Sequence, residues 1–207
     1  MEKNSRIYPA EISDEELSSY SYNSFGGKII LVDTFRKFRQ VIPGLKSEGV
    51  FGFDTETKPS FKKGRKNKVA LIQLSTASHA YLFRLNLIGL PEALAGLLSD
   101  GSIVKAGVAV RDDLKVLQDY RKFEPAGFID LQTIARQNGI MNISLKKLSA
   151  IVLGFRISKR QQVTDWEAAQ LTEAQLLYAA TDAWICHEIY RELSGNGLLS
   201  GKETTGI

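Results

Sequence analysis

The sequence predicts a single α/β domain in which helices pack on a mixed β-sheet. Three strand-like segments (residues 50–56, 69–75 and 80–83) follow one another without an intervening helix, which predicts consecutive antiparallel strands. From residue 91 onward, helical and strand-like patterns alternate. A meander followed by such alternation is typical of a mixed sheet covered by helices. The length of 207 residues suits one domain of this kind.

The elements before the meander are expected to be short. Residues 1–26 form an N-terminal extension, and the segment Ser13–Glu16 has the pattern of a helix capping box. After the extension, a strand is expected over residues 28–32. A helix follows it and is expected to end near Val41, because Pro43 interrupts the helical pattern.

The elements after the meander are mostly helices. Helical periodicity is found over residues 91–98, 112–120, 131–137, 144–152 and 172–193, and a strand is expected over residues 103–110. The last segment, residues 195–207, is rich in Gly and Ser and is expected to be a flexible tail. The folded domain is therefore expected to cover residues 27–194.

Composition excludes several classes of protein. Hydrophobic residues make up 43% and charged residues 24%, which excludes a wholly disordered chain. No apolar run has the roughly 18–20 residues of a membrane span, so no membrane partner is expected. Cys186 is the only cysteine, so no disulfide can form within the chain. This suits a reducing, intracellular location, and we expect the protein to be cytoplasmic.

Two carboxylates end the first strand of the meander. Asp54 and Glu56 are two residues apart, so in a strand they project from the same face. Like charges side by side repel each other unless something compensates, and a divalent cation such as Mg²⁺ or Mn²⁺ does so. The alternative is a strand that emerges into solvent, where both acids are simply hydrated.

A second polar pair lies within the last predicted helix. Tyr178 and Asp182 are four residues apart and share a helical face with the apolar Ile185 and Ile189. An acid on a face directed toward the core costs free energy unless it is paired or binds a metal ion. A Tyr–Asp hydrogen bond would also satisfy this carboxylate, so the pair alone does not decide between the two interpretations.

Adjacent acids, Asp112 and Asp113, occur where a predicted strand gives way to a helix. The helix dipole favours acids in a first turn, so capping is a sufficient explanation for one of them. By helical spacing, Asp113 shares a face with Val116 and Leu117 and is expected to point inward. Asp112 is expected to face water and to cap the helix. If one of the two is functional, Asp113 is the candidate.

Taken together, these motifs resemble the three exonuclease motifs of the DEDD superfamily, in its tyrosine subgroup, which includes ribonuclease D and the Werner-syndrome helicase exonuclease domain. The resemblance runs from about Lys28 to Leu193. The segments that carry it are Phe53-Asp54-Thr55-Glu56-Thr57, Val69-Ala70-Leu71-Ile72-Gln73-Leu74, Lys105-Ala106-Gly107-Val108 before Asp113, and Tyr178-Ala179-Ala180-Thr181-Asp182. The histidine subgroup has a His five residues before the last Asp, and here that position is Leu177.

The resemblance implies a ribonuclease-H-like fold and metal-dependent 3′-to-5′ exonucleolysis that releases nucleoside 5′-monophosphates. It implies two divalent ions, Mg²⁺ or Mn²⁺, with Asp54, Glu56, Asp113 and Asp182 as ligands. Tyr178 would position or help to deprotonate the attacking water. Two-metal catalysis suits these residues, because four carboxylates supply hard oxygen ligands.

Basic residues suggest where a nucleic acid would bind. No acid occurs between Thr57 and Pro91, and the start of this stretch is strongly basic. A solvated loop and a surface that contacts phosphates are both compatible with this pattern. The candidate nucleic-acid-binding residues are Thr57, Lys58, Lys62, Lys63, Arg65, Lys66, Lys68, Lys159 and Arg160. The expected partner is DNA or RNA with a free 3′ end.

Three further polar or aromatic residues are expected to be structural. Gln73 interrupts an apolar strand and is expected to be a satisfied core amide rather than a support for the site. Trp166 is expected to pack rather than to stack on a base, and Asp130 to cap a helix.

Two other functions stay open beside the exonuclease. A non-catalytic nucleic-acid-binding adaptor on the same fold is favoured if the acids bind no divalent metal. A ribonuclease-H-like endonuclease is the second alternative. The placement of Tyr178 and Asp182 on one helix disfavours it, and circular single strands distinguish it, because an exonuclease needs an end.

Overall fold

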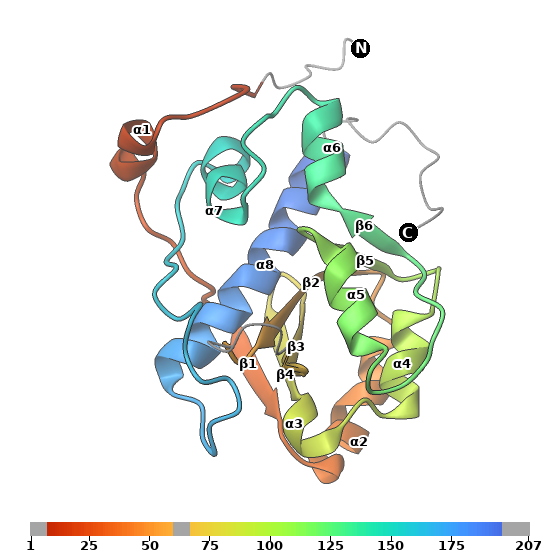
Figure 1. Ribbon diagram of the computed structural model, residues 1–207. Helices are drawn as coiled ribbons and strands as arrows, with labels where there is room; N and C mark the ends of the chain where they lie inside the picture. Colours follow the sequence, from red (N-terminus) through yellow and green to blue (C-terminus); the bar gives the residue numbers. More distant parts are fainter. Residues whose placement is uncertain (1–7, 60–66, 196–207) are drawn as a thin grey trace.

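A six-stranded mixed sheet lies at the centre of the computed structural model, which describes residues 8–59 and 67–195 (Figure 1). The strand order is β1-β4-β3-β2-β5-β6. The strands are β1 (Lys28–Val32), β2 (Val50–Thr57), β3 (Val69–Ser75), β4 (His79–Arg84), β5 (Val104–Gly107) and β6 (Phe128–Asp130). The pairs β2–β3 and β3–β4 are antiparallel, whereas β1–β4, β2–β5 and β5–β6 are parallel. The predicted mixed sheet with an antiparallel meander is therefore confirmed.

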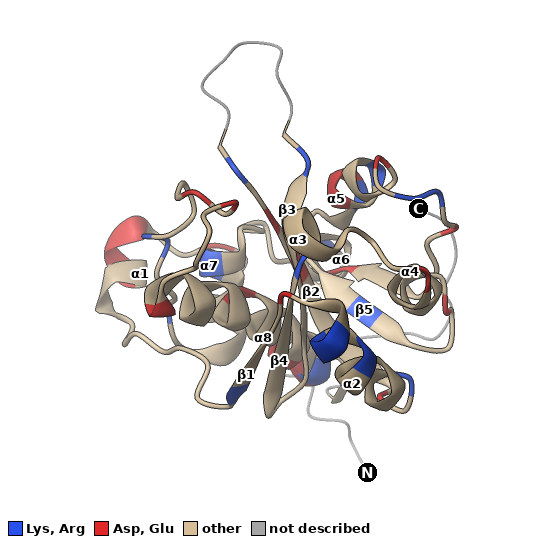
Figure 2. Ribbon diagram, turned by 90° about the horizontal axis from the view of Figure 1, so that it is seen from below, with Lys and Arg blue, Asp and Glu red and all other residues tan. Residues whose placement is uncertain are grey.

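The two faces of β2 carry different residue types because side chains alternate along a strand. Phe51 and Phe53 are fully buried on one face, in a cluster with α2 (Phe35–Leu45), α4 (Glu92–Leu98) and α5 (Val110–Leu117). The other face of β2 packs against α8 (Glu173–Gly195). Figure 2 views the sheet from its edge and shows these helices on opposite sides of it.

Gly52 lets α8 lie close to β2. A Cβ atom at this position would lie 1.8 Å from the Ala183 carbonyl oxygen and 2.5 Å from the His187 backbone nitrogen. Any other residue would therefore push the helix away from the strand. This close approach brings the acids of the strand and the helix together.

Four short helices and one π-helical turn complete the described part of the fold. These are α1 (Asp14–Ser19), α3 (Leu85–Ile88), α6 (Leu131–Gln137), α7 (Leu145–Leu148) and the π-helical turn η1 (Ser149–Leu153). The described part of the N-terminal extension packs on this body, since Tyr8, Ile12 and Leu17 are buried with residues of α6 and α8. The capping box of Ser13 and Glu16 is present. Among the described helices, none has the length and apolar character needed to cross a bilayer.

The structure corrects the expected bounds of the first long helix and of the fifth strand. Helix α2 does not end near Val41 but runs through Pro43 to Leu45, because buried Ile42 and Leu45 hold its last turn against the core. Strand β5 ends at Gly107 rather than Val110, because Ala109 adopts a left-handed conformation with φ of 56°. Helix α5 therefore starts earlier than expected, at Val110.

Three other bounds also differ. Helix α5 ends at Leu117, before the expected Tyr120. The helix expected over residues 144–152 is α-helical only to Leu148 and continues as the π-helical turn to Leu153. Gly154, whose φ is +79°, follows as the C-cap residue. Helix α8 continues to Gly195, where the flexible tail was expected to begin; residues 196–207 lie outside the described residues.

Candidate active site

Three carboxylates meet where β2 and α8 are in contact. Asp54 and Glu56 project from one face of β2, and Asp182 projects from α8. One carboxylate oxygen from each of these residues lies within 4.8 Å of those of the other two. The alternation of the strand and the helical approach at Gly52 together produce this cluster.

The three acids line a cavity of about 290 Å³. Its walls come from β2, α8, the start of α7 and the segment that precedes α8. The lining residues are Asp54, Thr55, Glu56, Val108, Ser144, Leu145, Lys159, Gln162, Tyr178 and Asp182. The cavity thus combines acids with one lysine and several uncharged groups.

Burial and mutual repulsion disfavour ionisation of the three acids. Burial raises the pKa of Asp54 well above its usual value, and the neighbouring Asp182 and Asp113 raise it further. The pKa of Glu56 rises to about 10 and that of Asp182 to about 6, with burial as the largest cause of both shifts. The Lys159 ammonium opposes all three shifts.

The cluster fits a hard divalent cation. Its donors are carboxylate oxygens, which Mg²⁺ and Mn²⁺ prefer. Glu56 and Asp182 are buried, and Asp54 is half-buried. Asp182 Oδ1 is buried without a hydrogen-bond partner among the described residues, so this oxygen is available as a ligand. A cation here would offset the repulsion between the carboxylates and stabilise their ionised forms.

Asp113 lies beside the cluster but outside the group of three. The Thr55 hydroxyl donates a hydrogen bond of 2.8 Å to Asp113 Oδ1 and so ties α5 to β2. Burial raises the pKa of Asp113 to about 6. The charge of Asp113 in turn raises the pKa of Asp54 and Glu56, so it belongs to the same electrostatic environment.

Asp112 does not cap α5, contrary to expectation. The N-cap residue is Ala109, and no side chain makes a capping hydrogen bond there. The Asp112 side chain is 90% exposed and forms an ion pair with Lys115 at 3.0 Å. The expected division between an inward Asp113 and an outward Asp112 is confirmed.

Tyr178 lies beside the acids with its ring buried. It is 7% exposed and lines the acidic cavity together with Asp182. Burial and the surrounding acids raise the pKa of this phenol above its usual value. Tyr178 therefore stays protonated, and its hydroxyl acts as a hydrogen-bond donor. The ring of the fully buried Trp166 lies 6.0 Å from it, so Trp166 packs as expected.

The candidate nucleic-acid-binding residues are scattered over several environments. Lys58 is ion-paired with Asp165 at 2.9 Å and lies 3.8 Å from Glu167, which links the end of β2 to the segment before α8. Lys68 lies over the Tyr120 ring at 5.1 Å. Thr57 is the last residue of β2, and Lys159 lines the acidic cavity. Lys62, Lys63, Arg65 and Lys66 lie outside the described residues.

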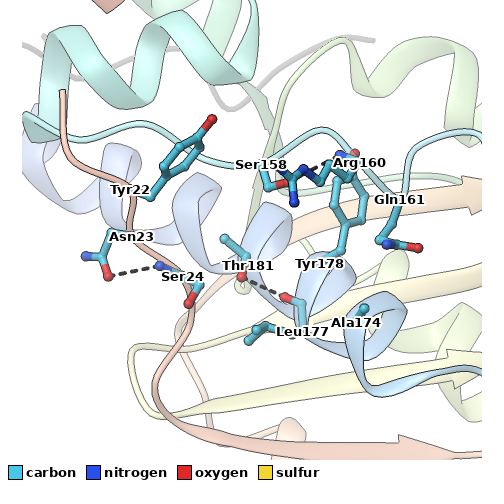
Figure 3. A pocket seen from close by; sticks show the side chains of 10 residues that line it. All are labelled: Tyr22, Asn23, Ser24, Ser158, Arg160, Gln161, Ala174, Leu177, Tyr178 and Thr181. Atoms are coloured by element: carbon cyan, nitrogen blue, oxygen red, sulfur yellow. Dashed lines mark hydrogen bonds between the residues drawn. The ribbon is translucent and has the colours of Figure 1, made fainter. Parts of the chain in front are cut away.

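Arg160 lines a second pocket of about 550 Å³, which shares Tyr178 with the acidic cavity (Figure 3). The other lining residues are Tyr22, Asn23, Ser24, Ser158, Gln161, Ala174, Leu177 and Thr181. One wall is therefore the end of the N-terminal extension. The Phe25 backbone N–H donates to the Thr181 hydroxyl at 3.0 Å, which fixes this wall to α8.

Besides the role of Asp112, sequence reasoning misjudged Gln73 and missed some of these residues. Nothing in the sequence identifies Thr55 or Gln162 as a residue of the site, because hydroxyl and amide side chains are common in strands and loops without any function. Gln73 was expected to be a satisfied amide, but both its Nε2 and Oε1 atoms are buried without a partner among the described residues. Asp130 caps α6 as expected and also accepts a hydrogen bond from the Ala109 N–H at 3.2 Å.

Comparison with known proteins identifies the family. A family model described as 3′-5′ exonuclease matches residues 29–196. The bifunctional 3′-5′ exonuclease/ATP-dependent helicase WRN of Mus musculus is 37% identical over 161 residues, which are 74% of this chain and 11% of that protein. Exonuclease 3′-5′ domain-containing protein 2 of Homo sapiens is 33% identical over 195 residues, which are 86% of this chain and 31% of that protein. The chain thus spans less than a third of the length of either relative.

Solved structures agree with this assignment. The EXO domain of Aedes aegypti Nibbler superposes with a TM-score of 0.75 at 25% identity and covers 84% of this chain and 92% of that one. Escherichia coli RNase D gives a TM-score of 0.70 at 25% identity, over 83% of this chain and 47% of that one. Because the family match spans most of the chain and the neighbours share its ribonuclease-H-like sheet, the chain belongs to the 3′-5′ exonuclease family of the DEDD superfamily.

Proposed function

We propose that this chain hydrolyses phosphodiester bonds from the 3′ end of a nucleic acid and releases nucleoside 5′-monophosphates in a reaction that depends on divalent metal. The observation that carries this proposal is the cluster of the half-buried Asp54 with the buried Glu56 and Asp182, whose carboxylate oxygens lie within 4.8 Å of one another. A buried like-charged cluster is unfavourable in a protein that binds no cation.

Two Mg²⁺ or Mn²⁺ ions are proposed as cofactors. The cluster of three acids would hold one ion, and Asp113, tied to β2 through Thr55, would help Asp54 to hold the second. When bound, the ions supply Lewis-acid activation of water and stabilise the charge on the leaving 3′ oxygen. Lys159 brings a positive charge to the same cavity and is placed to attract a substrate phosphate.

The substrate is proposed to be DNA or RNA with a free 3′ end. Escherichia coli RNase D is an exoribonuclease involved in structured RNA processing, whereas the name of the mouse relative specifies neither DNA nor RNA. The assay should therefore include RNA, single-stranded DNA and recessed duplex DNA.

A labelled-oligonucleotide assay tests the proposal directly. With Mn²⁺ or Mg²⁺, a strand labelled at its 5′ end should shorten stepwise from its 3′ end, and EDTA should stop the reaction. A circular single strand should remain intact. Cleavage of the circle would instead favour an endonuclease, and binding without cleavage would favour the adaptor.

Tyr178→Phe is expected to slow 3′ hydrolysis by about ten- to a hundredfold while metal affinity stays close to that of the wild type. The substitution removes the hydroxyl beside the acids of the cavity but keeps the buried ring. Turnover should be measured under single-turnover conditions, and Mn²⁺ affinity by calorimetry. Unchanged turnover would remove the tyrosine from the mechanism.

Neutralising the basic segment after β2 is expected to weaken nucleic-acid binding and to flatten its salt dependence, by about 0.7 in the log–log slope for each lost contact with a single strand. The test variant changes Lys62, Lys63, Arg65, Lys66 and Lys68 to Gln. A charge-matched control changes five basic residues on or beside β1 and α2 to Gln. These are Lys28, Arg36, Lys37, Arg39 and Lys46. Equal salt slopes for the two variants would show that the segment makes no specific contribution.

A further inference from the structure

Gln73 is a fully buried amide in the middle of β3, and neither its Nε2 nor its Oε1 atom has a hydrogen-bond partner among the described residues. Buried amides in proteins are normally satisfied. The buried Gln175 follows this rule, since its Oε1 accepts from the Thr172 N–H at 3.0 Å and its Nε2 donates to Thr164 Oγ1 at 3.0 Å. Core packing alone would be served better at position 73 by a leucine or a methionine.

The sheet register places Gln73 next to the acidic cluster. Gln73 on β3 is directly opposite Asp54 on β2, and residues paired in this way project from the same face of the sheet. The Cβ atoms of opposite residues lie about 4.5–5.5 Å apart, which is within the reach of a glutamine side chain. The neighbours on either side, Gly52 opposite Ser75 and Glu56 opposite Leu71, belong to the same face, which α8 covers.

On the side away from Asp54, the neighbour of Gln73 is apolar. Its partner on β4 is the fully buried Leu82, which packs with Leu71, Trp166 and Ala179. Water therefore does not compete for the amide from that side. Across the strand pair, the side chain opposite Gln73 is that of Asp54, a member of the acidic cluster in which Asp182 Oδ1 also lacks a partner.

We propose that Gln73 is a positioning residue of the metal site, whose amide N–H donates a hydrogen bond to the Asp54 carboxylate when that carboxylate is ionised and holds a cation. This inference rests on the proposed function. An amide suits the task because it donates a hydrogen bond at every working pH and adds no charge. Such outer-shell hydrogen bonds orient metal-binding carboxylates and strengthen metal affinity.

The test compares Gln73→Met with Gln175→Met. Gln73→Met is expected to lower Mn²⁺ affinity by about tenfold, measured by calorimetry without nucleic acid. The thermal midpoint of the metal-free protein should stay the same or rise, because an unsatisfied buried amide is removed. Gln175→Met should do the opposite: the midpoint falls because satisfied hydrogen bonds are lost, and Mn²⁺ affinity is unchanged.

A second measurement needs no substitution at the site. In the wild-type protein, the side-chain NH₂ resonances of Gln73 should shift downfield when diamagnetic Mg²⁺ is added, whereas those of Gln175 should not. Wild-type Mn²⁺ affinity in Gln73→Met, or a Gln73 resonance that does not respond to Mg²⁺, would overturn the role of Gln73 and leave the proposed function intact. A wild-type protein that binds neither ion would overturn both.

Discussion

Asp182→Asn is expected to lower the rate of 3′ nucleotide release by more than about a hundredfold, because even outer-shell partners of a metal site typically contribute ten- to a hundredfold and Asp182 belongs to the ligand cluster itself. Asn keeps the size of the side chain but supplies only one neutral carbonyl oxygen. The rate should be measured at saturating Mn²⁺, so that a loss of affinity and a loss of turnover can be separated. Asp54→Asn should behave in the same way.

Folding of these variants can be checked independently of activity. Replacing one of the buried, mutually repelling acids by Asn should raise the thermal midpoint of the metal-free protein, because a desolvated carboxylate is removed. Asp112→Asn is the matched control, since this residue adjoins Asp113 but is 90% exposed and paired with Lys115. Asp112→Asn should retain wild-type turnover. An Asp182→Asn protein that cleaves at the wild-type rate would disprove the assignment of the site.

The parts of the site that follow from local periodicity could be predicted from the sequence. The period of two along β2 predicts that Asp54 and Glu56 lie on one face of the strand. The spacing of four residues predicts that Tyr178 and Asp182 lie on one face of α8. Apolar alternation likewise predicted the three strands of the meander, whose antiparallel pairing is confirmed. Each of these inferences uses residues no more than a few positions apart.

The relative placement of distant elements could not be predicted in this way. The approach of Asp182 to Asp54 depends on how closely α8 crosses β2 at Gly52, which is a property of packing. The residue at which α5 begins depends on the left-handed Ala109, an unusual conformation for alanine that leaves no signal in the sequence. The ion pair of Lys58 with Asp165 joins residues 107 positions apart.

Errors at helix and strand ends have the same origin. Pro43 is a helix breaker by its own chemistry, yet α2 includes it because the buried Leu45 stabilises the last turn. The judgement on Gln73 failed for a related reason: an amide within an apolar strand predicts a hydrogen bond, but only the three-dimensional surroundings show whether a partner is present.

Metal binding and pH should be strongly linked to the stability of this protein. Folding raises the pKa of Asp182 and Asp113 to about 6 and that of Glu56 to about 10, mainly through burial. A carboxyl group with a raised pKa holds its proton more tightly in the folded state. Its contribution is therefore fully present below the unfolded value of about 4 and is lost as the pH rises toward the folded value.

In EDTA, the thermal midpoint should therefore fall between pH 5 and pH 8. The whole shift of Asp182 corresponds to roughly 3 kcal/mol. About half of it is lost between pH 5 and pH 8, which is roughly 1.5 kcal/mol or roughly 3–6 °C for a domain of this size, and Glu56 adds to the fall. Mg²⁺ or Mn²⁺ at pH 8 should reverse this loss, because a cation stabilises the ionised carboxylates, and its binding should release protons.

The acidic cluster can be separated from other sources of pH dependence by comparing variants. Asp54→Asn with Asp182→Asn should reduce both the fall of the midpoint with pH and the rise produced by metal, whereas Asp112→Asn should preserve both. Differential scanning calorimetry at pH 5 and pH 8, with EDTA and with Mn²⁺, gives four thermal midpoints for each protein. These midpoints provide both the fall with pH and the rise with metal. A midpoint in EDTA that is the same at both pH values would mean that folding does not suppress ionisation of these carboxylates. A midpoint that Mn²⁺ leaves unchanged would mean that no cation stabilises their ionised forms. The two results together would show that the carboxylates do not form a metal site.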